Sequence, residues 1–174
     1  MNRMRKVLIA DDEVKVGQLV KRLIQWDRLG LTCIGLVTDG QTAYEKILSE
    51  SPDIVITDIR MPVLTGLEMI QKASEQGVKC HFIVVSGYKY FDYAQKALKY
   101  GVEDYLLKPI DEDELNRQLQ KIVAEEEQRE DKQQQVNQIE KKLEDSKYLR
   151  HKEFLRQILS QKQENIDAAN TEFG

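Results

Sequence analysis

The sequence predicts an open, doubly wound α/β domain with a parallel sheet, followed by a long helical extension. Five short apolar runs, partly β-branched, alternate with segments whose apolar residues recur at helical spacing. Such alternation is typical of a parallel sheet with helices on both faces. The two parts also differ in turn formers, because all three prolines and every glycine except Gly174 lie at or before Pro109. A stretch without glycine or proline favours uninterrupted helix.

The elements of the first part follow one another regularly along the chain. The predicted strands are the apolar runs 7–10, 34–37, 54–57, 82–85 and 105–107. The predicted helices lie between and after them, with the apolar stripes Val16, Leu19, Val20, Leu23 and Ile24; Ala43, Ile47 and Leu48; Leu67, Ile70 and Ala73; Ala94, Ala97 and Leu98; and Leu115, Leu119 and Ile122. We expect this domain to occupy residues 1–124 and a helical linker to occupy residues 125–174.

Length and composition narrow the class of protein. A chain of 174 residues suggests one domain with an appendage. The net charge of −4 gives no general attraction to nucleic acid or to anionic membranes. The apolar runs are too short to cross a bilayer, and an acidic segment follows the first run, which disfavours a signal peptide. The 2 cysteines are too few for a disulfide framework or a cysteine zinc site. We therefore expect a cytoplasmic protein without membrane contact.

Polar residues stand at the carboxyl ends of four of the predicted strands. In an open α/β sheet, ligands bind beyond these ends. The residues at these positions are Asp11 and Asp12, Asp58, Ser86 and Lys108. Three carboxylates, a hydroxyl and an ammonium are thus expected to meet at one edge of the sheet.

This set of groups suits one kind of chemistry. Two carboxylates ~5 Å apart repel each other by ~3 kcal/mol at an effective dielectric constant of about 20. Three carboxylates together retain protons or bind a cation, and Mg²⁺ is the natural candidate for oxygen ligands. A carboxylate beside a metal and an ammonium also suits phosphoryl transfer. Each residue alone has an ordinary alternative role, since aspartate often caps a helix, so the prediction depends on their occurring together.

The segments LIADDE, DIRMP, SGY and DYLLKP resemble the receiver domain of two-component response regulators. The resemblance covers residues 5 to about 124. It implies a flavodoxin-like sheet of strand order 2-1-3-4-5. It also implies that Asp58 accepts a phosphoryl group from a phosphohistidine of a sensor histidine kinase. Lys108 would pair with the phosphoryl oxygens, and Ser86 would donate a hydrogen bond to them and move toward them. Tyr105 matches the aromatic residue that turns inward when Ser86 moves.

The same resemblance implies a Mg²⁺ site and a slow reaction cycle. The expected ligands are the carboxylates of Asp11 (mainly through water), Asp12 and Asp58 and the backbone carbonyl of Arg60. The Lys108–Pro109 bond is typically cis in the family. Such a protein is a phosphoacceptor and not an enzyme, although small phosphodonors and Mg²⁺ allow self-phosphorylation, followed by slow autodephosphorylation. The bulky Arg60 and Tyr88 either shield the acyl phosphate from water or point to solvent, and the sequence leaves both readings open.

The extension resembles the linker of a larger regulator. Apolar residues at Val136, Ile139 and Leu143 fit about two heptads of a coiled coil, and a single solvated helix is the alternative. The stretch SGYKYFDYAQKAL and the long charged linker resemble response regulators with an AraC-type DNA-binding output domain. The chain shows no helix-turn-helix pair or basic stripe, so DNA binding would belong to a domain missing from it.

The sequence thus predicts a phosphorylation-activated switch of a transcription factor. Homodimerisation is expected through the face of the fourth helix, fifth strand and fifth helix, through the C-terminal helix, or through both. The alternative is a constitutive dimerisation scaffold with no phosphate chemistry, which would not require Asp58 or Lys108. An aspartyl-phosphate hydrolase is disfavoured because the residues from Asp58 to Arg60 lack the DxD pattern.

Overall fold

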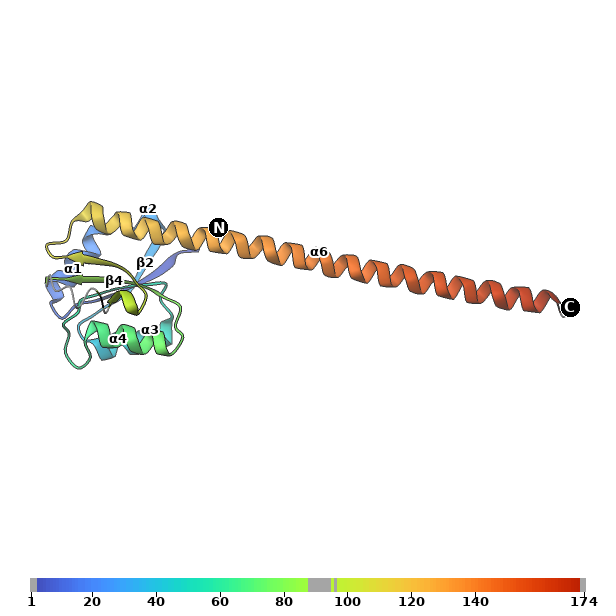
Figure 1. The fold of residues 1–174 in the computed structure, drawn as a ribbon. Helices are drawn as coiled ribbons and strands as arrows, with labels where there is room; N and C mark the ends of the chain where they lie inside the picture. Colours follow the sequence, from blue (N-terminus) through green and yellow to red (C-terminus); the bar gives the residue numbers. More distant parts are fainter. Residues whose placement is uncertain (1–2, 88–94, 96, 173–174) are drawn as a thin grey trace. The chain divides into compact units, whose positions relative to one another are not determined.

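The computed structural model describes residues 3–87, 95 and 97–172 (Figure 1). For residue 103 and residues 162–172 it describes the backbone only. The chain divides into two compact units, Met1–Ala124 and Glu125–Gly174. A continuous helix, α6, contributes to both units, because it runs from Glu112 to Glu172.

The first unit is built on a five-stranded parallel sheet of order β2-β1-β3-β4-β5, which confirms the predicted fold class. The strands are β1 (Arg5–Ala10), β2 (Leu31–Val37), β3 (Ile54–Thr57), β4 (His81–Ser86) and β5 (Val102–Leu107). The order makes β1 and β3 neighbours, with Ala10 opposite Thr57. The residues that follow these two strands therefore lie side by side.

Helices cover both faces of the sheet (Figure 1). They are α1 (Val14–Leu23), α2 (Trp26–Leu29), α3 (Gly40–Glu50), α4 (Gly66–Glu75) and the first turns of α6. Because side chains alternate along a strand, each strand supplies both apolar layers. Val55 and Val84 pack with α3 and α4, whereas Ile54 and Ile83 pack with α1, α2 and the start of α6. The sheet is thereby fixed from both sides.

The structure corrects several details of the prediction. Strands β2 and β5 begin three residues before the predicted runs, at Leu31 and Val102, because polar residues interrupt the apolar pattern on these edge strands. Leu19, Leu48 and Leu98 are exposed, since the buried stripe of each helix is narrower than its set of apolar residues. Four residues, Trp26–Leu29, form the short α2, which was not predicted. Ala94 of the predicted fourth helix lies outside the described residues.

Side chains define where two helices begin. Asp39 caps α3 by accepting a hydrogen bond from the Thr42 backbone amide at 2.7 Å, and the bonds from Thr42 lower the pKa of this carboxyl. Thr65 and Glu68 form a reciprocal capping box at α4, in which each side chain accepts a hydrogen bond from the other residue's backbone amide. The box sets the start of α4 just after the loop that follows β3.

The second unit consists of the continuation of α6. Its side chains are exposed throughout residues 128–161. The exposed residues include nine large apolar ones: Val136, Ile139, Leu143, Tyr148, Leu149, Phe154, Leu155, Ile158 and Leu159. None of the helices in the described part of the chain has the length and apolar character needed to span a membrane.

Replacing Thr65 tests the helix cap. Thr65→Ala removes the hydroxyl that accepts from Glu68 N, and we expect the free energy of unfolding to fall by about 1 kcal/mol. Ser74→Ala, at an exposed position near the other end of α4, is the matched control and should leave stability nearly unchanged. Equal effects of the two substitutions in urea unfolding would contradict the assigned cap.

Glu68, the acidic residue of the capping box, makes the free energy of unfolding depend on pH. Hydrogen bonds from Thr65 lower the pKa of Glu68 from its ordinary 4.5. A carboxyl with a lowered pKa stabilises the fold above its unfolded pKa and loses this contribution as the pH falls through its folded pKa. The stability difference between wild type and Glu68→Gln should therefore shrink below about pH 4.5.

Candidate functional site

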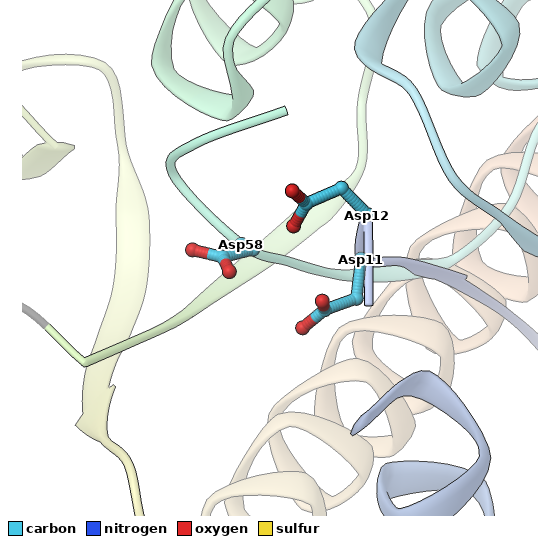
Figure 2. A group of neighbouring side chains, drawn as sticks. All are labelled: Asp11, Asp12 and Asp58. Carbon is cyan, nitrogen blue, oxygen red and sulfur yellow. The ribbon is translucent and has the colours of Figure 1, made fainter. Parts of the chain in front are cut away.

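Three carboxylates meet at the carboxyl edge of the sheet. Asp11 and Asp12 follow β1, and Asp58 follows β3. One carboxylate oxygen from each of the three lies within 4.8 Å of the others (Figure 2). The backbone amide of Asp58 donates to Ala10 O at 2.9 Å, so the hydrogen bonding of the two strands continues into the cluster. Adjacent strands thus bring the predicted carboxylates together.

Lys108 supplies the cation of this cluster. Its Nζ lies 2.9 Å from Asp58 Oδ2 and 3.1 Å from Asp11 Oδ2. The residue follows β5, and its backbone amide donates to Ser86 O at 3.0 Å. The Lys108–Pro109 bond is cis, as the resemblance implies. The side chain therefore reaches the carboxylates of β1 and β3 from the end of β5, two strands away from β3.

The Asp58 carboxylate is oriented through both of its oxygens. Oδ1 accepts hydrogen bonds from the backbone amides of Ile59 at 2.6 Å and Arg60 at 3.4 Å. Oδ2 accepts from Lys108. Asp11 is held in a similar way, because its Oδ1 accepts from Glu13 N at 2.9 Å and its Oδ2 from Lys108. Asp12 is exposed. The cluster therefore has two fixed, buried carboxylates and one that faces solvent.

Burial and charge act on the pKa values of two of these groups. Burial raises the pKa of Asp11, and the nearby Asp58 charge adds to the effect, against the lowering hydrogen bonds from Glu13 and Lys108. For Lys108, burial acts to lower the pKa, but the hydrogen bonds to Asp58 and Asp11 outweigh it, and the net shift is upward. Lys108 therefore stays charged at neutral pH. Among the described residues, one ammonium faces the three carboxylates, which leaves an excess of negative charge, and this set of oxygens could hold a metal ion.

The remaining predicted residues lie around this cluster. Ser86 ends β4, between β3 and β5, and is fully buried. Tyr105 in β5 is half-buried and packs against the apolar layer of α3 and α4. The Arg60 side chain is exposed, while its backbone amide faces Asp58. Tyr88 lies outside the described residues, so the proposal of a shielding pair is not tested there.

Residues that the sequence analysis missed hold the loop after β3. A Cβ on Gly66 would lie 1.9 Å from Asp58 O, closer than any side chain allows. A Cβ on Gly40 would similarly lie 1.8 Å from Leu64 O. In the same loop, Leu64 N donates a hydrogen bond to Pro62 O at 2.8 Å. This bond closes a γ-turn centred on Val63, whose φ is +68°. Gly40 and Gly66 are the first residues of α3 and α4. A glycine at this position could have indicated the contact from the sequence, because glycine often marks a close approach of two backbone segments.

Comparison with known proteins identifies the family. Residues 7–120 match the model of the response regulator receiver domain. The chain therefore belongs to the response regulator receiver family, as the sequence motifs predicted. Members of this family are signalling modules and not conventional enzymes.

Named relatives and a solved structure agree with this assignment. The uncharacterized transcriptional regulatory protein YesN of Bacillus subtilis is 46% identical over 122 residues, which are 70% of this chain and 33% of that protein. The transcriptional regulatory protein HptR of Staphylococcus aureus is 35% identical over 120 residues, 69% of this chain and 47% of its own length. The receiver domain of AraT, a response regulator from Geobacillus stearothermophilus, superposes with a TM-score of 0.69 at 36% identity and covers 73% of this chain and 98% of that structure. The chain thus spans about a third of the length of YesN and about half of the length of HptR.

Gly66 provides a test of the loop geometry. Gly66→Ala places a methyl group against the Asp58 carbonyl, so we expect a loss of more than about 2 kcal/mol in the free energy of unfolding, as for overpacked sites. The matched control is Gly35→Ala, where the new Cβ would make ordinary contacts of 3.4 Å and more. Comparable stability of the two variants in urea unfolding would contradict the close approach.

Proposed function

We propose that this chain is the phosphoacceptor module of a two-component response regulator and that Asp58 takes its phosphoryl group from a sensor histidine kinase. The observation that carries the proposal is the ion pair of 2.9 Å between Lys108 Nζ and Asp58 Oδ2, within a group of three carboxylates. A cation and an oriented carboxylate at an oxygen-rich site are the groups that phosphoryl transfer uses.

The reaction assigns a role to each group. A carboxylate oxygen of Asp58 attacks the phosphorus of the phosphohistidine, the P–N bond breaks, and its electron pair stays on the imidazole. Lys108 neutralises charge on the phosphoryl oxygens as they arrive. The carboxylates of Asp11, Asp12 and Asp58 and the carbonyl of Arg60 would hold Mg²⁺, with Asp11 acting mainly through water. The metal, when bound, supplies further positive charge for the equatorial phosphoryl oxygens.

Phosphorylation would be read out inside the same domain. The phosphoryl group adds roughly −1.5 to −2 charges at neutral pH. Ser86 would move toward it and donate a hydrogen bond, and Tyr105 would turn further into the apolar layer. Both residues lie on the strands next to the cluster, β4 and β5. We propose that this shift alters a dimer face formed by β5 and the helices on either side of it, where Leu98 and Leu107 are exposed.

The extension would carry the signal to an output. We propose that residues 125–174 are a helical linker whose apolar positions Val136, Ile139 and Leu143, at heptad spacing and exposed, pair with a second copy. The names of YesN and HptR describe transcriptional regulation, which supports an output domain beyond this chain. We propose an AraC-type DNA-binding domain and a cytoplasmic setting.

Metal binding tests the acidic cluster without phosphate. Asp12→Asn removes a proposed direct ligand from the solvent side, and we expect the Mg²⁺ affinity to fall by about tenfold or more, at least as much as when an outer-shell partner is lost. Asp27→Asn, an exposed aspartate of α2, should keep the wild-type affinity. Calorimetric titration after treatment with a chelator measures both. Equal affinity of wild type and Asp12→Asn would exclude Asp12 as a ligand.

Phosphorylation itself is tested with a small phosphodonor. With acetyl phosphate and Mg²⁺, we expect a single phosphoryl adduct in the intact mass of wild type and of Asp27→Asn, and none in Asp58→Asn. Size-exclusion chromatography of the same samples should show a shift toward dimer only where the adduct forms. A dimer throughout, with no adduct in wild type, would instead support the constitutive scaffold.

A further inference from the structure

The peptide unit that follows Asp58 holds its carboxylate and is itself held by Thr57. The amide end of this unit, Ile59 N–H, donates to Asp58 Oδ1 at 2.6 Å. The carbonyl end, Asp58 O, accepts a hydrogen bond from Thr57 Oγ1 at 2.9 Å. Because a peptide unit is planar, fixing its carbonyl also fixes the direction of its N–H. The Thr57 hydroxyl therefore sets the direction from which Oδ1 is held.

A hydroxyl is an unusual group at this position of the sheet. Thr57 ends β3, whose other residues are isoleucine and valine, and its relative exposure is 1%. Packing in a central strand is satisfied equally well by valine, and a buried hydroxyl must recover its lost hydration through hydrogen bonds. Oγ1 also lies 4.0 Å from the Met61 sulfur, which is a weak acceptor. The strong hydrogen bond of this hydroxyl is the one to the Asp58 carbonyl.

The Gly66 backbone lies close to the same carbonyl. A Cβ at Gly66 would lie 1.9 Å from Asp58 O and 3.1 Å from Thr57 Oγ1. The Asp58 carbonyl thus contacts a hydroxyl and lies against a glycine backbone, and both limit the rotation of the peptide unit. With the peptide unit held in this way, Asp58 Oδ1 accepts a hydrogen bond from the Ile59 backbone amide, and Oδ2 accepts one from Lys108.

We propose that Thr57 is a positioning residue for phosphoryl transfer, which orients the Asp58 carboxylate through the Asp58–Ile59 peptide unit. The inference rests on the proposed function of Asp58. The effect of the Thr57 hydroxyl on the Ile59 amide and on the orientation of the Asp58 carboxylate can be measured without any phosphate.

The test compares two substitutions of Thr57. Thr57→Val keeps the shape and removes the hydroxyl, whereas Thr57→Ser keeps the hydroxyl and removes a methyl group. At saturating Mg²⁺ and acetyl phosphate, we expect Thr57→Val to lower the phosphorylation rate constant by about tenfold, within the range for losing the partner of a buried polar group, and Thr57→Ser to stay near wild type. The amide proton resonance of Ile59 should move in Thr57→Val and return in Thr57→Ser. Thr32→Val in β2, at a half-buried position away from the cluster, should change neither quantity.

The outcomes separate the two proposals. A wild-type rate and an unchanged Ile59 resonance in Thr57→Val would overturn the positioning role, as would a Thr57→Ser variant as slow as Thr57→Val. If wild type forms no acyl phosphate, the proposed function fails, and the Ile59 resonance still decides whether Thr57 orients Asp58. Should Thr57→Val not fold, Thr57→Ala and Thr57→Ser form the matched pair, because both lack the methyl group and they differ only in the hydroxyl.

Discussion

The bridge made by Lys108 between Asp11 and Asp58 is the interaction on which the rest of the site depends. Two buried carboxylates from neighbouring strands would repel each other by ~3–4 kcal/mol at short range and an effective dielectric constant of about 20. The ammonium, 2.9 and 3.1 Å from them, offsets this repulsion. Because the third carboxylate, Asp12, is exposed and has no ammonium partner in the described part of the chain, the site keeps negative charge that attracts a divalent cation. The strand order makes the bridge possible, since it puts the ends of β1, β3 and β5 on one edge.

The backbone next to Asp58 complements this bridge. Lys108 holds one carboxylate oxygen, and the amides of Ile59 and Arg60 hold the other. Those amides belong to a loop that closes on the start of α4, where the Thr65–Glu68 capping box and Gly66 fix its far end. A preorganised carboxylate needs little rearrangement when a phosphoryl group arrives. The cluster of charges and the packing of the loop therefore serve the same reactive group.

Much of the fold and of the candidate site follows from the sequence, because both depend on short-range patterns. Apolar runs mark the strands, and in a parallel sheet the polar residues after them must share an edge, which is why Asp11, Asp58 and Lys108 could be placed together. Contacts made only in the folded chain could not be predicted in this way. The need for glycine at position 66 arises from the Asp58 carbonyl, and the role of the Thr57 hydroxyl arises from the same group. The exposure of Leu19 and Leu48 depends in the same way on how each helix is rotated against the sheet.

The most direct measurement is to locate the phosphoryl group on the chain. Wild type phosphorylated with acetyl phosphate and Mg²⁺ is reduced with borohydride, which converts an aspartyl phosphate to homoserine, and its peptides are then sequenced by mass spectrometry. Homoserine at position 58 alone is the expected result, because the Asp58 carboxylate is the one held between Lys108 and the backbone amides. Homoserine at position 11 or 12, or an adduct that leaves position 58 unreduced, would contradict Asp58 as the acceptor.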